Sequence, residues 1–344
     1  MKIQELVKKH DPQNQFKVLQ DSYKQIEIAW NNKFSLAGLK ADKIRNIVLS
    51  GLGGSAIAGD LINTYLKDDL EIPLLVNRNY SLPVFANKKT LVIISSYSGN
   101  TEETISVLNE AIKKKCIIVA LTSGGEVKKI CKKNKIPVVE VPQGFQPRYA
   151  LPLSFFSVLK ILQKLKIIGK ENNNVNKIID LYKSKGKEFS AETNSAFLFA
   201  ENLIGFIPVI YSIADLNSSI GYRFKCQFNE NSKLHAFHNI LPELNHNEII
   251  GWESFAEKQF AAKIIFLEDD SCHSQIKKRI KITSELASKS GVEVLTLKSN
   301  EENFKVRIFD LIYLCDWITF YLAVMREFDP SEINYINELK IRLS

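Results

Sequence analysis

The sequence has little cysteine, and its five cysteines are scattered and odd in number. None belongs to a C-x-x-C pair, which argues against a disulfide framework or a cysteine-based zinc site and favours free thiols in a reducing compartment. The first residues lack the apolar core of a signal peptide, and no run of about 18 apolar residues occurs. We therefore expect a cytoplasmic protein that does not interact with a membrane.

The basic segments of the sequence lack interleaved aromatic residues, which are typical of nucleic-acid-binding segments. The formal net charge is +8, but the lysines fall in short runs such as residues 113–115 and 132–133. Such runs are typical of solvated helix ends and loops. We expect no nucleic-acid partner, although the basic surface would attract an anionic substrate at long range.

The length and composition are those of a globular protein with two domains. The chain has 344 residues, of which 45% are hydrophobic and 24% are charged. Segments with the pattern of buried strands alternate with segments of helical spacing. In the first half we predict strands at 46–50, 73–77, 90–95, 116–121 and 137–141, and helices at 55–66, 101–114, 125–133 and 149–167. In the second half we predict strands at 208–212, 263–267 and 292–297, and helices near 189–203, 217–230, 273–290, 303–326 and 331–343.

This alternation predicts an α/β fold in which mainly parallel sheets are flanked by helices on both faces. Residues 170–176 are polar, rich in asparagine and without periodicity, so the domain boundary is expected near them. The predicted organisation is an N-terminal helical arm (1–43), a first domain (44–168), a linker (169–187) and a second domain (188–344) that includes the C-terminal helix.

Two turns in the first domain have the composition of a phosphate site. Residues 95–104, SSYSGNTEET, directly follow an apolar strand, and residues 51–56, GLGGSA, follow another. Each turn opens a helix, whose first N–H groups and partial positive charge favour an anion. Ligands of parallel sheets bind beyond the carboxyl ends of the strands. The predicted phosphate-binding residues are Gly54, Ser55, Ser96, Ser98 and Thr101.

Other readings of these turns fit less well. The serine-rich loop has no lysine, so it is not a Walker-type loop and implies no magnesium nucleotide. The glycine-rich turn resembles the start of a dinucleotide fingerprint with Ala56 at the third glycine position. No acid follows at residues 74–78, where that fingerprint needs one. An ordinary helix capped by Ser or Thr remains an alternative.

Four motifs occur along the chain in a fixed order: GLGGS at 51–55, SSYSGNTEET at 95–104, NENSK at 229–233 and PELNHNE at 242–248. Together they resemble the bifunctional phosphoglucose/phosphomannose isomerase family, which is built from two sugar-isomerase (SIS) domains. The likeness runs from about residue 45 to the C-terminus, and the N-terminal arm matches least. Lys340 matches the family's terminal lysine, and Arg148 its active-site arginine. The resemblance implies two tandem flavodoxin-like SIS domains in a homodimer with shared active sites.

The resemblance also implies an enzyme that needs no metal or other cofactor. It would interconvert glucose 6-phosphate, and mannose 6-phosphate, with fructose 6-phosphate through a cis-enediol. Glu230 would be the base, Arg148 the cation beside the enediolate, and His246 and Lys340 the pair that opens the sugar ring. These residue types suit such chemistry, because proton transfer between C1 and C2 needs a carboxylate base and donors to the enediolate oxygen.

Several alternatives stay open at the level of the sequence. Glu230 and Lys340 would ordinarily be solvated, Arg148 could pair with a surface acid, and His246 could be a surface residue or a cap. His235, His238 and His246 form a rival zinc set, but no cysteine or acid in a recognised ligand pattern accompanies them. The competing functions are a sugar-phosphate-binding SIS regulatory protein without catalysis and an SIS isomerase for a pentose phosphate or an amino sugar.

Overall fold

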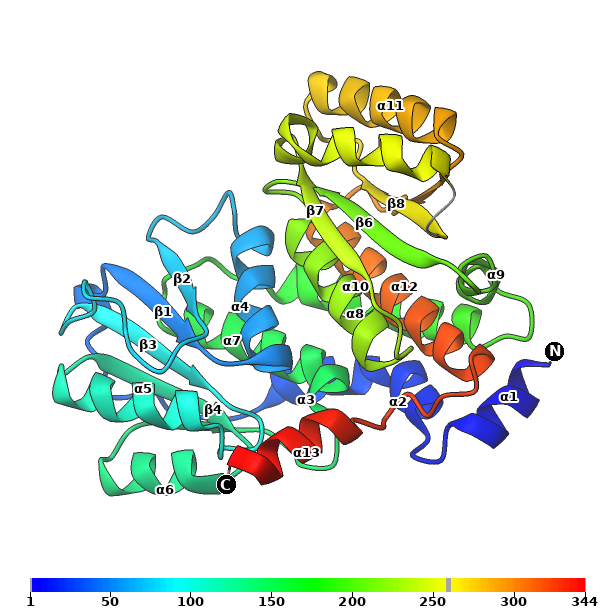
Figure 1. Ribbon diagram of the computed structural model, residues 1–344. Helices are drawn as coiled ribbons and strands as arrows, with labels where there is room; N and C mark the ends of the chain where they lie inside the picture. The colour runs from blue at the N-terminus through cyan, green and yellow to red at the C-terminus, as the bar shows by residue number, and fades with distance from the viewer. Residues whose placement is uncertain (1, 258–260, 344) are drawn as a thin grey trace. The chain divides into compact units, whose positions relative to one another are not determined.

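The computed structural model describes residues 2–257 and 261–343 (Figure 1). The chain divides into two compact units. The first-sheet unit is Ser22–Ile179, and the second-sheet unit combines Met1–Asp21 with Asp180–Ser344. Each unit is built around one parallel sheet, so the predicted α/β architecture of two tandem domains is confirmed.

The first-sheet unit holds a five-stranded parallel sheet in the order β2-β1-β3-β4-β5. Its central strands are continuous apolar runs that are buried along their length, as expected for strands covered on both faces. The strands are β1 (Asn46–Ser50), β2 (Leu74–Asn77), β3 (Thr90–Ser95), β4 (Ile117–Thr122) and β5 (Val138–Glu140). The helices are α3 (Ser22–Asn31), η1 (Ala41–Lys43), α4 (Gly53–Tyr65), α5 (Glu102–Lys113), α6 (Gly125–Lys133), η2 (Pro147–Ala150) and α7 (Leu151–Lys164).

The second-sheet unit holds a four-stranded parallel sheet in the order β7-β6-β8-β9. Its strands are β6 (Ile207–Ile213), β7 (Phe237–Leu241), β8 (Ala262–Glu268) and β9 (Glu293–Lys298). Its helices are α1 (Ile3–His10), α2 (Gln15–Gln20), α9 (Ser195–Glu201), α10 (Ser218–Glu230), η3 (Glu243–His246), η4 (Glu248–Glu257), α11 (Ser274–Lys289), α12 (Phe304–Met325) and α13 (Asn334–Leu343). The order β7-β6-β8-β9 repeats the order β2-β1-β3-β4, so the two units share a strand topology.

Helix α12 is the core helix of the second-sheet unit. Among the described helices it is long and apolar enough to cross a membrane, with a mean hydropathy of 1.6 over 18 residues, yet 89% of that window is buried. Its aromatic side chains pack against the start of the chain, since the ring of Trp317 lies 5.2 Å from that of Phe16. The Tyr313 hydroxyl also donates to the carbonyl of Leu19 at 2.6 Å. The apolar character of α12 is therefore explained by packing inside this unit.

The structure differs from the sequence-based expectation at two segments. Residues 169–187 were expected to be a linker, but most of them lie in α8 (Asn172–Phe189), and the two units divide within this helix. Asparagines at the start of α8 hide its helical spacing of Val175, Ile178 and Tyr182, which are buried. The expected arm is also divided, because α1 and α2 belong to the second-sheet unit and α3 packs on α7 in the other.

Strand β7 was not predicted from the sequence. It is short, and its centre is the polar pair His238 and Asn239, so it lacks the apolar pattern of the other strands. It lies at the edge of its sheet, where a half-exposed strand tolerates polar residues.

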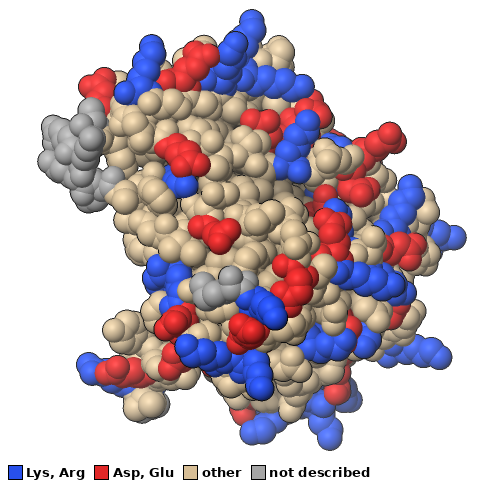
Figure 2. Space-filling view, turned by 90° about the vertical axis from the view of Figure 1, so that its right-hand side faces the viewer, with Lys and Arg blue, Asp and Glu red and all other residues tan. Residues whose placement is uncertain are grey.

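The charged surface matches the expectation of a solvated exterior. On the face drawn in Figure 2, Lys and Arg side chains are interspersed with Asp and Glu.

Candidate active site

The glycine-rich turn joins β1 to α4 at the carboxyl edge of the first sheet. A Cβ atom added to Gly51 would lie 2.8 Å from the carbonyl oxygen of Ser95, so this position has no room for a side chain. The turn therefore touches the end of β3, where the serine-rich loop begins. Both predicted turns meet at one edge of the sheet, as parallel strands require.

The serine-rich loop is held by its own hydroxyl groups. Ser96 Oγ donates to Thr101 Oγ1 at 3.1 Å and accepts the backbone N–H of Gly99 at 3.1 Å. Thr101 is the N-cap of α5, so these hydroxyls lie beside the first N–H groups of that helix. Ser98 is exposed. Hydroxyl groups and the first N–H groups of α5 thus lie in one short turn, a composition that suits a phosphate.

Gly99 allows this loop to lie against the turn that follows β4. Its φ of +73° falls in the left-handed region, and a Cβ atom there would lie 1.9 Å from the carbonyl oxygen of Gly124. Any larger residue would push the two loops apart. The contact joins residues that are 25 positions apart, which is why the sequence alone did not reveal it.

Tyr97 holds the loop from its other side. Its hydroxyl donates to the carbonyl of Pro142 at 2.9 Å and accepts the backbone N–H of Phe145 at 3.0 Å. Burial raises the pKa of Tyr97, so the phenol stays protonated at neutral pH. Sequence reasoning assigned this residue no role.

Arg148 lies beside the glycine-rich turn in the same unit. A Cβ atom on Gly54 would lie 2.6 Å from the carbonyl oxygen of Pro147 and 3.4 Å from the Cα of Arg148. Arg148 is buried, and it belongs to η2, immediately before α7. The structure thus brings the backbone of η2, with Pro147 and Arg148, against Gly54 of the glycine-rich turn.

The other predicted residues belong to the second-sheet unit. Glu230 is the last residue of α10 and is half-buried. His246 is exposed at the end of η3, where the neighbouring Asn245 donates to Thr283 Oγ1 at 2.9 Å. Lys340 is exposed on α13.

Glu248, a further acid of the PELNHNE motif, is engaged in a structural network. It accepts the Tyr211 hydroxyl at 2.6 Å and the Asn239 amide at 2.5 Å, while Trp252 donates to the same hydroxyl at 2.8 Å. Burial, followed by the hydrogen bond to Glu248, raises the pKa of Tyr211. A carboxylate held by two donors is poorly suited to removing a proton from carbon.

The rival zinc set is dispersed. His238 Nε2 lies 2.7 Å from Ser212 Oγ, and burial lowers the pKa of His238 to about 4. Among residues 2–257 and 261–343, no three His, Cys, Asp or Glu side chains gather as a metal-binding group.

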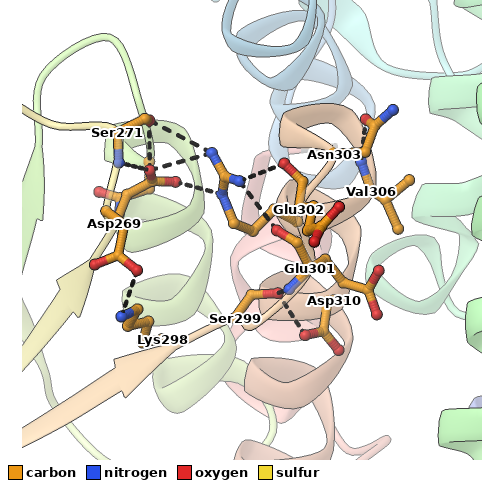
Figure 3. A network of polar contacts seen from close by, with 12 residues as sticks. Asp269, Ser271, Lys298, Ser299, Glu301, Glu302, Asn303, Val306 and Asp310 are labelled. Carbon is orange, nitrogen blue, oxygen red and sulfur yellow. Dashed lines mark hydrogen bonds and ion pairs between the residues drawn. The ribbon is translucent and has the colours of Figure 1, made fainter.

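The carboxyl edge of the second sheet is filled by an ion-pair network (Figure 3). Arg307 Nε donates to Asp269 Oδ2 at 2.9 Å, and its Nη1 donates to the carbonyls of Glu301 and Glu302 at 3.0 and 2.9 Å. Ser299 donates to Asp310 at 2.6 Å. The cavity lined by Asp269, Ser299 and Arg307 has a volume of about 10 Å³, enough for roughly one water molecule but not for a phosphate.

Known proteins match the chain over most of its length. Residues 192–343 match the bacterial phospho-glucose isomerase C-terminal SIS domain. A bifunctional phosphoglucose/phosphomannose isomerase of Caldicellulosiruptor bescii is 38% identical over 89% of this chain and 91% of its own length. The Aquifex aeolicus protein of the same name is 34% identical, over 94% and 99%.

A more distant relative and a solved structure complete the comparison. A D-glucosamine-6-phosphate 4-epimerase of Sulfolobus acidocaldarius is 33% identical over 64% of this chain and 68% of its own length. The C-terminal domain of glucosamine-fructose-6-phosphate aminotransferase from Francisella tularensis has a TM-score of 0.66 at 13% identity, covering 92% of this chain and 96% of that one. This last likeness concerns the fold alone.

Proposed function

Because the chain belongs to the bifunctional phosphoglucose/phosphomannose isomerase family, we propose that it interconverts glucose 6-phosphate and mannose 6-phosphate with fructose 6-phosphate. The observation that carries the proposal is the meeting of two donor-rich turns and a buried arginine at one sheet edge. Gly54, Ser55, Ser96, Ser98 and Thr101 bind the phosphate group. Helix N-termini and hydroxyls hold an anion there without a metal ion.

We assign proton transfer and ring opening to the remaining predicted residues. Glu230 removes the C2 proton of the open-chain aldose and returns it to C1, which passes through a cis-enediol. Arg148 stabilises the negative charge that develops on the enediolate oxygen, because a buried guanidinium loses little of its field to solvent. His246 and Lys340 open the pyranose ring. Both epimers give the same enediol, so one base serves both.

The active site is completed by a second copy of the chain in a homodimer. This arrangement is proposed from the resemblance to the bifunctional phosphoglucose/phosphomannose isomerase family. The enzyme acts in the cytoplasm, on the hexose phosphates of glycolysis and gluconeogenesis. The first SIS domain, 44–168, supplies the phosphate site, and the second, 188–344, supplies the base.

A substrate panel tests the proposal. The purified protein is assayed with EDTA against glucose, mannose, fructose, glucosamine and pentose phosphates. We expect interconversion of the three hexose phosphates and no inhibition by EDTA. Activity confined to glucosamine 6-phosphate would favour the second candidate, an amino-sugar enzyme, which the 4-epimerase relative makes worth testing. Binding of hexose phosphates without turnover would instead indicate a regulatory protein.

A further inference from the structure

Glu230 is the last residue of α10, and the face of α10 that carries it is fixed to α12. Arg223, Gln227 and Glu230 are spaced by four and three residues, so they share one face of the helix. Arg223 Nη2 donates to both carboxylate oxygens of Asp316 at 2.9 Å, and Gln227 donates to Asp316 Oδ1 at 3.0 Å. The carboxylate of Glu230 is near enough to Arg223 to interact with its charge.

The residues that follow Glu230 are fixed to the next turn of α12. Asn231 Nδ2 donates to Thr319 Oγ1 at 3.0 Å, and Ser232 Oγ donates to the Thr319 carbonyl at 2.7 Å. The Thr319 hydroxyl in turn donates to the carbonyl of Asp316 at 3.0 Å. Asn231, Ser232 and Thr319 are all fully buried. A single hydroxyl group therefore joins the end of α10 to the Asp316 turn.

The end of α10 is also capped by a cation. Lys233 Nζ donates to the carbonyl of Glu230 at 3.0 Å and to that of Asn231 at 3.2 Å. Arg326, at the end of α12, donates from Nε to the carbonyl of Ser232 at 3.1 Å. These bonds satisfy carbonyls that the end of a helix leaves open, and they restrain the backbone on either side of Glu230.

We propose that Thr319 is a positioning residue for the base, holding Glu230 through Asn231 and, with Asp316, fixing the last turns of α10. The assignment rests on the proposed function of Glu230. A base that must reach a carbon-bound proton loses rate when it is displaced by about 1 Å, so the anchoring contributes to turnover rather than to phosphate binding.

The test compares two single-hydroxyl deletions on the same helix. Thr319→Val keeps the side-chain shape and removes the bond from Asn231. Tyr321→Phe is the matched control, because its hydroxyl bonds to Phe189 and Asn194 and not to α10. We expect Thr319→Val to lower kcat about 10- to 100-fold with little change in KM. The deuterium isotope effect on kcat with C2-deuterated glucose 6-phosphate should rise. Thr319→Ser should restore turnover, and Tyr321→Phe should lower only the melting temperature.

The outcomes separate this assignment from the proposed function. An active wild type, an inactive Glu230→Gln and a Thr319→Val variant that behaves like Tyr321→Phe would overturn the positioning role alone. A wild type without isomerase activity would overturn the proposed function and this role with it. If Thr319→Val does not fold, Thr319→Ala provides the test, because it removes the same hydroxyl without adding volume. An unchanged kcat and isotope effect in Thr319→Ala would then overturn the proposal.

Discussion

The two sheets share a strand order, but different groups lie at their carboxyl edges. At the edge of the first sheet, glycines bring backbone close together and Ser96 and Thr101 provide hydroxyls. At the edge of the second, Asp269 and Arg307 fill the space with a salt bridge at 2.9 Å. The hydrogen bonds of Ser96 at the first edge join hydroxyl and backbone groups. At the second, a phosphate would compete with Asp269 for the guanidinium and meet a carboxylate.

This difference indicates that two units with the same strand topology have different roles. We propose that the first edge keeps the ligand position that parallel sheets offer, whereas the Asp269–Arg307 ion pair occupies the corresponding position at the second. The proposed base of the second-sheet unit lies instead at the end of α10, where α12 holds it. Topology therefore predicts where a site can form, and side-chain chemistry decides whether it does.

The largest expected effect comes from the proposed base. Glu230→Gln keeps the shape of the side chain but cannot accept a proton from carbon, so turnover should fall at least about 10²–10⁴-fold. Glucose 6-phosphate and mannose 6-phosphate activities should fall together, because one enediol serves both. Binding of a sugar-phosphate analogue should remain, as measured by calorimetry.

Glu248→Gln is the matched control for this prediction. Glu248 is bonded to Tyr211 and Asn239, so its replacement should lower the melting temperature and leave turnover largely intact. Loss of only one epimer's activity in Glu230→Gln, or more than about a tenth of the activity remaining, would contradict a single base at this position.

The residues at the carboxyl edge of the first sheet could be predicted from the sequence better than those at the carboxyl edge of the second. Residues 95–104 were identified because hydroxyls follow an apolar strand directly, a signal contained in one short segment. The Asp269–Arg307 pair joins residues 38 positions apart, and Gly99 meets Gly124 across two loops, so both depend on the folded arrangement. Strand β7 and helix α8 were missed because polar residues interrupt the one and begin the other.

Phosphate affinity should depend on the first edge alone. Ser96→Ala and Ser98→Ala should each remove a hydrogen bond to a charged group, worth about 1.5–3 kcal/mol, and together they should raise KM chiefly. Ser271→Ala at the second edge removes a hydroxyl that donates to Asp269 and should leave KM unchanged. Steady-state kinetics with fructose 6-phosphate measures both. Equal KM values for the double variant and the wild type would contradict the prediction that the phosphate binds at the carboxyl edge of the first sheet.

The free energy of unfolding, in contrast to KM, should depend on the ion pair at the carboxyl edge of the second sheet. Arg307→Met leaves the carboxylate of Asp269, which is 8% exposed, without its cation. We expect a loss of about 2 kcal/mol in unfolding free energy, below the value for a fully buried pair because Arg307 is partly solvated. Urea denaturation measures the loss, and KM should not change. The exposed Lys298, bonded to Asp270, is the control, since Lys298→Met should have little effect. A raised KM in Arg307→Met would mean that this edge binds substrate after all.

The smallest expected effect concerns the outer strand of each sheet, where the same packing position is apolar in one unit and polar in the other. A Cβ atom on Gly59 of α4 would meet the side chains of Val76 and Leu49 at 2.8 and 3.1 Å. A Cβ atom on Gly221 of α10 would meet His238 Nε2 at 2.5 Å and Ser212 Cβ at 2.9 Å. Only the second-sheet unit therefore has a titrating group at this position.

Burial, with a smaller contribution from Lys225, lowers the pKa of His238 to about 4, whereas an unfolded histidine titrates near 6.5. Between these values the unfolded chain binds the additional proton, so stability is retained above pH 6.5 and decreases as the pH falls toward 4. The slope of the unfolding free energy is at most about 1.4 kcal/mol per pH unit, which gives a loss of about 1–2 kcal/mol between pH 7 and pH 5.

The variant His238→Gln tests this pH dependence. It keeps a hydrogen-bonding group for Ser212 but cannot take up the proton, so its urea midpoint should depend less on pH. His235→Gln, at an exposed position, should follow the wild type. Parallel curves of urea midpoint against pH for His238→Gln and the wild type would mean that acid sensitivity arises elsewhere. The contact of Ser212 with His238 would then be no more sensitive to pH than the apolar contact of Leu49 and Val76 in the other unit.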